Sequence, residues 1–274
     1  MSKEPERTRF AIRFRGRAVY LTDILLSMSG LVGFVVVWQL ALEIGVMDAR
    51  IVPSPMEVFS MFFFKLTNVR PDGATLFANM YESFKVAITG FGIAIGIGVP
   101  LGLFMAWYKP VDKFVRPIFE IVRPISPIAW IPLMILLLGI GLRAKAFIVF
   151  FAAFTPSVIN SYTGVKLTPK PLIDVAKTCG ASNWQVFIKV AIPAAFPLIF
   201  SGIRISLIYS WAVLVGAEML ASNSGLGYMI LQGRQFQLPD LIIVGMLTIG
   251  LVGVVLSSIL STVENYIRKR RGGR

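Results

Sequence analysis

Residues 166–193, KLTPKPLIDVAKTCGASNWQVFIKVAIP, form a polar segment between two long apolar stretches. Apolar residues recur at helical spacing in both of its halves, which predicts two short helices, each with one apolar face. These residues are Leu172, Val175, Ala176 and Cys179 in the first half, and Trp184, Phe187, Ile188 and Ala191 in the second. The lysines of the segment and Asp174 occupy the opposite side, which we expect to face water.

The residues between the two halves predict a turn. Gly180 suits the left-handed residue that ends a helix. Ser182 and Gln185 have the spacing of a capping box, with which a second helix can start. We expect Pro193 to limit that helix and Cys179 to be a small buried hydrophobe. The segment therefore predicts a helix–turn–helix elbow that is amphipathic on both arms.

The elbow resembles the signature loop of the permease subunits of bacterial binding-protein-dependent ABC importers. That loop reads E-A-A-x3-G-x9-I-x-L-P, and the elbow keeps its spacing from Asp174 through Gly180 to Pro193, with four conservative departures. The shorter carboxylate of Asp174 is the departure most relevant to a partner. The resemblance implies an all-α type I permease fold in which this elbow is the coupling helix. It also implies contact with a cytoplasmic ATPase subunit through Asp174, Val175, Ala176, Lys177, Gly180, Ala181, Trp184 and Pro193.

An elbow lying on lipid headgroups is the alternative interpretation of the same amphipathic spacing. The fixed offsets of the glycine and the proline favour the coupling helix.

The composition is that of a polytopic membrane protein. Of 274 residues, 56% are hydrophobic and only 15% are charged, which is too apolar for a soluble domain. The net charge of +13 does not indicate nucleic-acid binding, because the basic residues lie at the ends of apolar segments. Without histidine and with one cysteine, the chain has no internal disulfide, no Cys/His zinc site and no histidine-activated nucleophile.

Six apolar segments bounded by charges are each long enough to cross the hydrocarbon as a helix. They are residues 24–42, 86–108, 124–142, 146–165, 191–217 and 241–263. The first is too long for a signal-peptide core, so we expect an uncleaved span. The predicted organisation is a basic arm at 1–23, a permease domain at 24–267 that includes the elbow, and a basic tail at 268–274. A short helix after Pro55 is expected to lie flat on the outer surface.

The distribution of basic residues orients these spans. The elbow side, with both termini, carries 18 lysines and arginines, whereas the opposite side carries 6. The positive-inside rule therefore places the elbow and both termini in the cytoplasm. Together with the resemblance, this predicts a multi-pass protein of the bacterial cytoplasmic (inner) membrane.

Several residues within the spans are candidates for packing or for the translocation pathway. Small residues at 92, 94, 96, 98 and 102 favour close approach of another helix. Prolines 124, 127 and 132 predict a kinked third span, either beside the pathway or serving packing alone. A lone arginine at position 204 indicates a functional site, unless it pairs or snorkels to the interface. Glu218 is a possible gate or pairing residue, with an interfacial position preferred. The pathway candidates are Ser126, Pro127, Trp130, Arg204, Trp211 and Glu218.

The chain has no G-x-x-x-x-G-K-[ST] phosphate loop, so its energy must come from a partner or from an ion gradient. An ion-coupled secondary carrier or a channel is the alternative, but such a carrier usually buries several acids or a histidine. A membrane-embedded enzyme would need more ionisable groups in the spans. We therefore expect no catalytic residue, metal or cofactor in this chain, with ATP and Mg²⁺ bound by the partner.

Residues 217–230, AEMLASNSGLGYMI, and the third span resemble one branch of these permeases, which carries nitrate, sulfonates, taurine and bicarbonate. The resemblance implies a small anion as substrate, although the branch also carries aromatic and vitamin-precursor solutes. The partners it implies are a second permease copy, two cytoplasmic ATPase subunits and an extracytoplasmic binding protein. Membrane lipid is expected around the spans, and nucleic acid is not expected as a partner.

Overall fold

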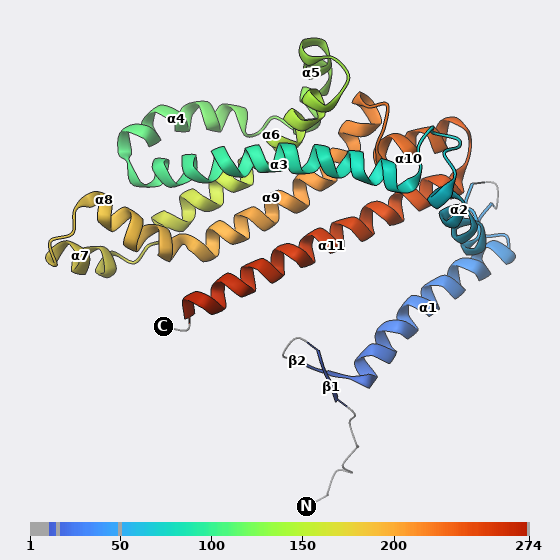
Figure 1. The fold of residues 1–274 in the computed structure, drawn as a ribbon, viewed down its shortest axis with the longest axis horizontal. Helices are drawn as coiled ribbons and strands as arrows, with labels where there is room; N and C mark the ends of the chain where they lie inside the picture. Colours follow the sequence, from blue (N-terminus) through green and yellow to red (C-terminus); the bar gives the residue numbers. More distant parts are fainter. Residues whose placement is uncertain (1–10, 15–16, 49–50, 273–274) are drawn as a thin grey trace, which may run out of the picture. The chain divides into compact units, whose positions relative to one another are not determined.

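The computed structural model describes residues 11–14, 17–48 and 51–272. It divides into two compact units, residues 1–62 and 63–274, with the boundary inside helix α2 (Pro55–Thr67). In the first unit, strands β1 (Ala11–Phe14) and β2 (Arg17–Tyr20) pair antiparallel before helix α1 (Leu21–Glu43) (Figure 1). The predicted basic arm therefore contains a small hairpin. Its residues 1–10 and 15–16, like residues 273–274 of the predicted tail, lie outside the described residues.

The second unit is built on four long helices that run side by side (Figure 1). They are α3 (Leu76–Trp107), α6 (Leu142–Lys166), α9 (Ile192–Ala221) and α11 (Pro239–Gly272). Within the described residues, these four are long and apolar enough to cross a membrane when α9 is taken with the helical turns before it. The apolar segments of the sequence predicted all four. Two shorter helices, α10 (Leu226–Gln235) and the elbow helix α7 (Lys170–Thr178), lie at opposite ends of this scaffold (Figure 1).

Helices α3 and α6 pack closely through small residues. A side chain at Gly98 or Gly102 would overlap atoms of α6, and Ala94 is fully buried. These three positions recur every four residues, so they share one face of the helix. The prediction of close packing is confirmed for that face. Gly92 and Gly96 lie on another side, where a side-chain carbon would have no described atom within 4 Å, so close packing there stays a prediction.

The third apolar segment is not one continuous helix, which corrects the prediction for residues 124–142. The chain forms α4 (Lys109–Val122), the 3₁₀ turn η1 (Pro127–Trp130) and α5 (Ile131–Leu138), with a bend of 84° between α4 and the η1–α5 pair. Prolines at 124, 127 and 132 interrupt the backbone hydrogen bonds, and Gly139 ends α5 with a positive φ of 73°. Helix α4 lies between the second and the third apolar segments of the sequence. Counting the bent pair as one span gives five candidate spans in the described chain.

The second arm of the elbow continues directly into the fifth apolar segment. Helix α8 (Asn183–Val186), the π-helical turn η2 (Phe187–Ala191) and α9 form one continuous helix of 39 residues, Asn183–Ala221. The Ile192 N–H bonds to the carbonyl of Phe187, one residue further back than in an α-helix. Pro193 lies inside this continuous helix, directly after the π turn. The expectation that Pro193 limits this helix is wrong.

Candidate functional site

The first helix of the elbow ends as its sequence predicts. Gly180 has a φ of +80°. Its N–H donates to the Lys177 carbonyl at 2.9 Å, and the Ala181 N–H donates to the Ala176 carbonyl at 3.1 Å. This pair of bonds is the Schellman motif, which satisfies carbonyls left free at the end of α7. A side chain at this φ would be strained even though the space around Gly180 is open.

The start of the second arm is also confirmed. The Ser182 hydroxyl accepts the Gln185 N–H at 3.3 Å, and the Gln185 side chain accepts the Ser182 N–H at 2.9 Å. This reciprocal capping box fixes the direction in which the chain leaves the turn. Both features depend only on neighbouring residues, so the sequence alone was enough to predict them.

Phe187 anchors the elbow to the scaffold. Its side chain is 2% exposed, and its ring centroid lies 5.3 Å from that of Trp107 and 5.7 Å from that of Phe104 at the end of α3. Ala191 and Val165 are buried in the same cluster. The sequence placed Phe187 on the apolar face of the second arm but did not identify it as the anchor. The aromatic residues at the end of the second apolar segment were the available signal.

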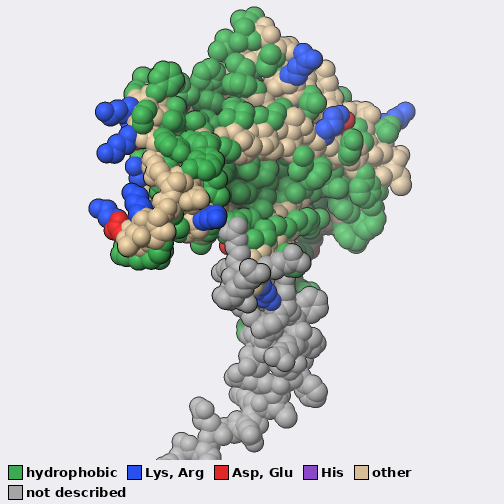
Figure 2. Space-filling model, turned by 60° about the vertical axis from the view of Figure 1, so that its left-hand side comes forward, with side chains coloured by type: hydrophobic (Ala, Val, Ile, Leu, Met, Phe, Trp, Pro, Cys, Tyr) green, Lys and Arg blue, Asp and Glu red, His purple; other side chains and the backbone are tan. Residues whose placement is uncertain are grey.

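The apolar face of the elbow is otherwise uncovered within the described chain. Val175 is 64% exposed, and Leu172, Trp184 and Ile188 are exposed as well. Cys179 is exposed too, so the expectation that it is buried is wrong for this chain. The lysines and Asp174 on the other side are exposed as predicted. Figure 2 turns the elbow end forward and shows basic side chains beside hydrophobic surface there.

The predicted ATPase-contact residues are close together with one exception. Asp174, Val175, Ala176 and Lys177 lie on α7, Gly180 and Ala181 form the turn, and Trp184 begins the second arm. Pro193 lies further along, exposed in the first turn of α9. Their contact with an ATPase stays a prediction.

The pathway candidates do not form one cluster. Ser126, Pro127 and Trp130 lie at η1, where the Trp130 ring packs 5.3 Å from Phe151. Trp211 is buried on α9, and its indole N–H donates to the Ile249 carbonyl of α11 at 3.1 Å. Trp211 therefore packs α9 against α11. The pathway role of all six candidates stays a prediction.

Arg204 has a partner that the sequence did not reveal. Its guanidinium forms an ion pair with Glu264 of α11, and both side chains are partly exposed. In the sequence, Glu264 only marks the end of the sixth apolar segment. Because the partners are 60 residues apart, only the antiparallel packing of α9 and α11 brings them together.

Glu218 is buried, which overturns the preferred interfacial position. It is 1% exposed and accepts hydrogen bonds from the Ser83 hydroxyl at 2.8 Å and from the Gly227 N–H at 2.9 Å. These bonds join α9 to α3 and to α10. Of the two roles considered for Glu218, pairing and gating, the structure supports pairing.

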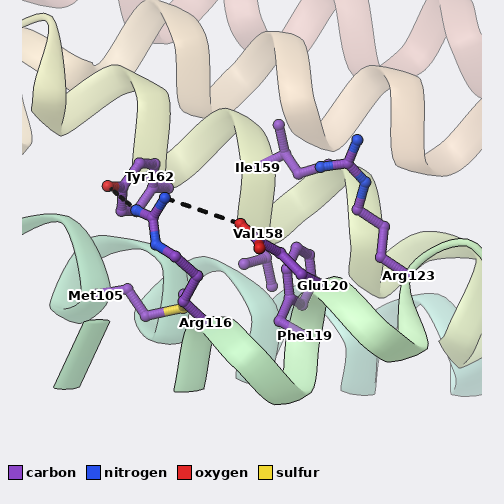
Figure 3. Close-up of a pocket in the computed structure, with 8 residues that line it drawn as sticks. All are labelled: Met105, Arg116, Phe119, Glu120, Arg123, Val158, Ile159 and Tyr162. Carbon is purple, nitrogen blue, oxygen red and sulfur yellow. Dashed lines mark hydrogen bonds and ion pairs between the residues drawn. The ribbon is translucent and has the colours of Figure 1, made fainter. Parts of the chain in front are cut away.

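A pocket of about 130 Å³ is lined by residues of α3, α4 and α6 (Figure 3). Arg116 of α4 dominates it: the guanidinium binds Asp112 at 3.0 Å, donates to the Tyr162 hydroxyl and lies over the Tyr162 ring. Glu120 is 3.9 Å from the same guanidinium. The contacts with Tyr162 link α4 to α6, whereas Asp112 and Glu120 lie on α4 itself. The described residues contain no group of three or more potential metal ligands.

Comparison with known proteins gives the family. A model of the family described as "Binding-protein-dependent transport system inner membrane component" matches residues 98–273, which is more than half of the chain. A putative ABC transporter permease protein of Methanocaldococcus jannaschii is 37% identical over 244 residues, covering 89% of this chain and 91% of the relative.

Two relatives with named solutes match over nearly their whole length. The taurine transport system permease protein TauC of Escherichia coli is 29% identical, covering 95% of this chain and 94% of the relative. The bicarbonate transport system permease protein CmpB of Synechococcus elongatus is 29% identical, covering 90% of each chain.

A solved structure agrees in fold. A chain of the MetNI methionine ABC transporter in an inward-facing conformation matches with a TM-score of 0.58 and 20% identity, covering 71% of this chain and 95% of that chain. The elbow, the helical scaffold and the family match agree. This chain therefore belongs to the family of binding-protein-dependent transport system inner membrane components.

Proposed function

We propose that this chain is the permease subunit of an ATP-driven importer for a small anion. In this proposal two copies enclose the pathway, an ATPase subunit binds the elbow of each copy in the cytoplasm, and an extracytoplasmic binding protein delivers the solute. The observation that carries the proposal is the exposed apolar face of the elbow at the end of a continuous helix that is long enough to span a membrane.

The elbow has the properties of a docking surface for a protein. Apolar side chains exposed together are costly in water, so they favour an occupant. The Phe187 anchor and the two caps fix the geometry of this surface before a partner binds, which lowers the ordering cost of binding. The lysines on the polar side of the elbow are exposed, which argues against a partner that covers both faces of the elbow.

The proposed topology has six spans with both termini in the cytoplasm. The spans are α1, α3, the bent pair of α4 with η1–α5, α6, α9 and α11. Within the second unit, α3 and α11 both run toward the elbow end (Figure 1), which supports a C-terminus on the elbow side. The excess of basic residues on that side supports the cytoplasmic assignment.

A small anion is proposed because the two relatives named for a solute transport taurine and bicarbonate. The basic residues of this chain do not add to that argument, since their distribution follows from topology.

Reconstitution in vesicles tests the proposal. We expect this chain alone to transport no taurine or bicarbonate, and to transport one of them when its partner ATPase and binding protein are added with ATP. Uptake by the chain alone along an ion gradient would instead establish the ion-coupled carrier, and the buried Glu218 is the feature that would then need explanation.

A substitution at the elbow tests the docking surface. We expect Val175→Asp to lower ATPase binding and ATP-dependent uptake by at least about tenfold, because burying a valine side chain contributes roughly 1.5–3 kcal/mol. Val46, in the turn after α1, is also exposed and provides the control substitution Val46→Asp. Normal ATPase binding by Val175→Asp would show that the partner does not use this face.

A further inference from the structure

A buried polar cluster, which we call the clasp, lies at the end of α9 opposite the elbow. It consists of Asn79 and Ser83 of α3, Glu218 of α9 and the backbone N–H groups of residues 225–227. Asn79 Oδ1 accepts the Gly225 N–H at 3.1 Å, and Ser83 Oγ accepts the Leu226 N–H at 2.8 Å. Glu218 Oε2 accepts the Gly227 N–H and the Ser83 hydroxyl. All three side chains are almost fully buried.

The clasp therefore satisfies the first N–H groups of α10 with side chains from two other helices. The first N–H groups of a helix have no partner within the helix itself. A carboxylate near this end is also favoured by the helix dipole. One end of α10 is thus bound to α3 and α9 by three buried hydrogen bonds, and a fourth joins Ser83 of α3 to Glu218 of α9.

The backbone of the clasp is tightly packed against its neighbours. Gly225 has a φ of +111°, and a side-chain carbon there would overlap the Glu218 carboxylate. A side-chain carbon at Gly227 would overlap the Val215 carbonyl of α9. Leu226 and Met229 of α10 are buried as well. Ser222, which directly follows α9, accepts a further hydrogen bond from the buried Lys145 of α6 at 2.7 Å.

The elbow and the clasp lie at the two ends of one helix. Residues 183–221 form one continuous helix, which includes the π turn at Phe187–Ala191 and Pro197, so the elbow and Glu218 belong to the same helix. At 1.5 Å per residue this helix is about 58 Å long, more than the hydrocarbon thickness of roughly 30 Å. Glu218 is the last acidic residue before the helix ends at Ala221.

We propose that Glu218 is a positioning residue which fixes α3 and α10 to the end of α9, so that the three helices move as one rigid body during transport. This inference rests on the proposed function, because it takes the elbow as the place where the movement starts. The alternative is that α10 is a gate, which releases its N-terminus from the clasp in each transport cycle.

Hydrogen–deuterium exchange of the wild-type complex separates these alternatives. The amides of residues 225–227 are measured in nanodiscs, in the resting complex and in the complex trapped with ATP and vanadate. A rigid body predicts that their exchange rates agree within about twofold in the two states. Exchange that is roughly tenfold faster in the trapped state would overturn the proposal in favour of a gate.

Substitutions then test Glu218 itself. Glu218→Ala removes both accepted bonds, so exchange at 225–227 is expected to rise at least about tenfold and uptake per assembled complex to fall at least about tenfold. Glu218→Gln keeps one acceptor oxygen for Ser83 and Gly227, so most protection and most uptake should be retained. Thr89→Ala on α3 is the matched control, since the Thr89 hydroxyl bonds only within its own helix.

Two results separate the failure of this inference from that of the proposed function. Unchanged exchange at 225–227 in Glu218→Ala would overturn the clasp even if the wild-type complex imports its solute. Wild-type complex that shows no ATP-dependent uptake would overturn the proposed function, and the exchange measurements would still decide whether Glu218 fixes α10.

Discussion

The two ends of the helix at residues 183–221 place their polar and apolar residues in opposite ways. At the elbow, apolar side chains such as Val175 and Trp184 are exposed. At the clasp, Glu218 and Ser83 are buried. Apolar groups are normally buried and charges normally exposed, so both ends depart from the usual pattern.

This difference in burial reflects where each end of the helix finds its binding partners. Most buried polar groups in proteins are hydrogen-bonded. In the clasp, Glu218 Oε2 finds its partners within the same chain, whereas Glu218 Oε1 is buried without a hydrogen bond among the described residues. Apolar side chains exposed to water are stabilised when a binding partner covers them. No described residue covers the apolar face of the elbow. The clasp thus contributes to the fold of this chain, whereas the elbow face is the surface that the proposed function assigns to a partner.

Outside the docking face and the clasp, the largest effect is expected at the turn of the elbow. Replacing Gly180 with valine forces a β-branched residue to a φ of +80°, which costs roughly 1–2 kcal/mol or more and shifts α7. We expect the variant to reach the membrane, because the surrounding space is open, while ATP-dependent uptake falls by about tenfold.

Gly45→Val is the matched control, since Gly45 has a φ of +79° and equally open surroundings in the turn after α1. Equal losses of uptake in the two variants would mean that strain alone, at any turn, explains the result. Normal uptake by the Gly180 variant would show that the elbow does not couple the ATPase to transport.

A smaller effect is expected between the two ends, at the ion pair of Arg204 and Glu264. Each alanine variant should lower the free energy of unfolding by roughly 1 kcal/mol, and the double variant should lower it little further, because either change removes the pair. Thermal unfolding in detergent measures the cycle. A large loss of uptake in Arg204→Ala with unchanged stability would contradict a packing role and favour the pathway.

The smallest effect is expected from Ser182→Ala. Loss of this cap should destabilise the first turn of the second arm by about 1 kcal/mol, which corresponds to roughly fivefold faster amide exchange at residues 183–187. The Phe187 anchor remains, so we expect uptake to fall by less than about twofold. Exchange that stays at the wild-type rate would show that the anchor, rather than the cap, fixes this turn.

The sequence predicted features that depend on neighbouring residues or on average composition. The Gly180 turn, the Ser182 capping box and four long apolar helices are all present. Prediction from the sequence failed where two structural preferences compete within one segment. Hydropathy favours a continuous helix over 124–142, whereas three prolines remove its hydrogen bonds, and the structure shows that the prolines prevail. At Pro193, by contrast, the helix continues, because the preceding π turn accommodates the proline.

What the sequence determined by itself is therefore the membrane class of the chain, the position of the elbow and the local geometry of its turn. Only the tertiary structure decided that Arg204 pairs with Glu264, that Phe187 anchors the elbow and that Glu218 is buried against Ser83. The physical reason is distance along the chain. Helical spacing and capping act over three or four residues, whereas these pairs are separated by 60 to 135 residues and meet only when long helices pack side by side.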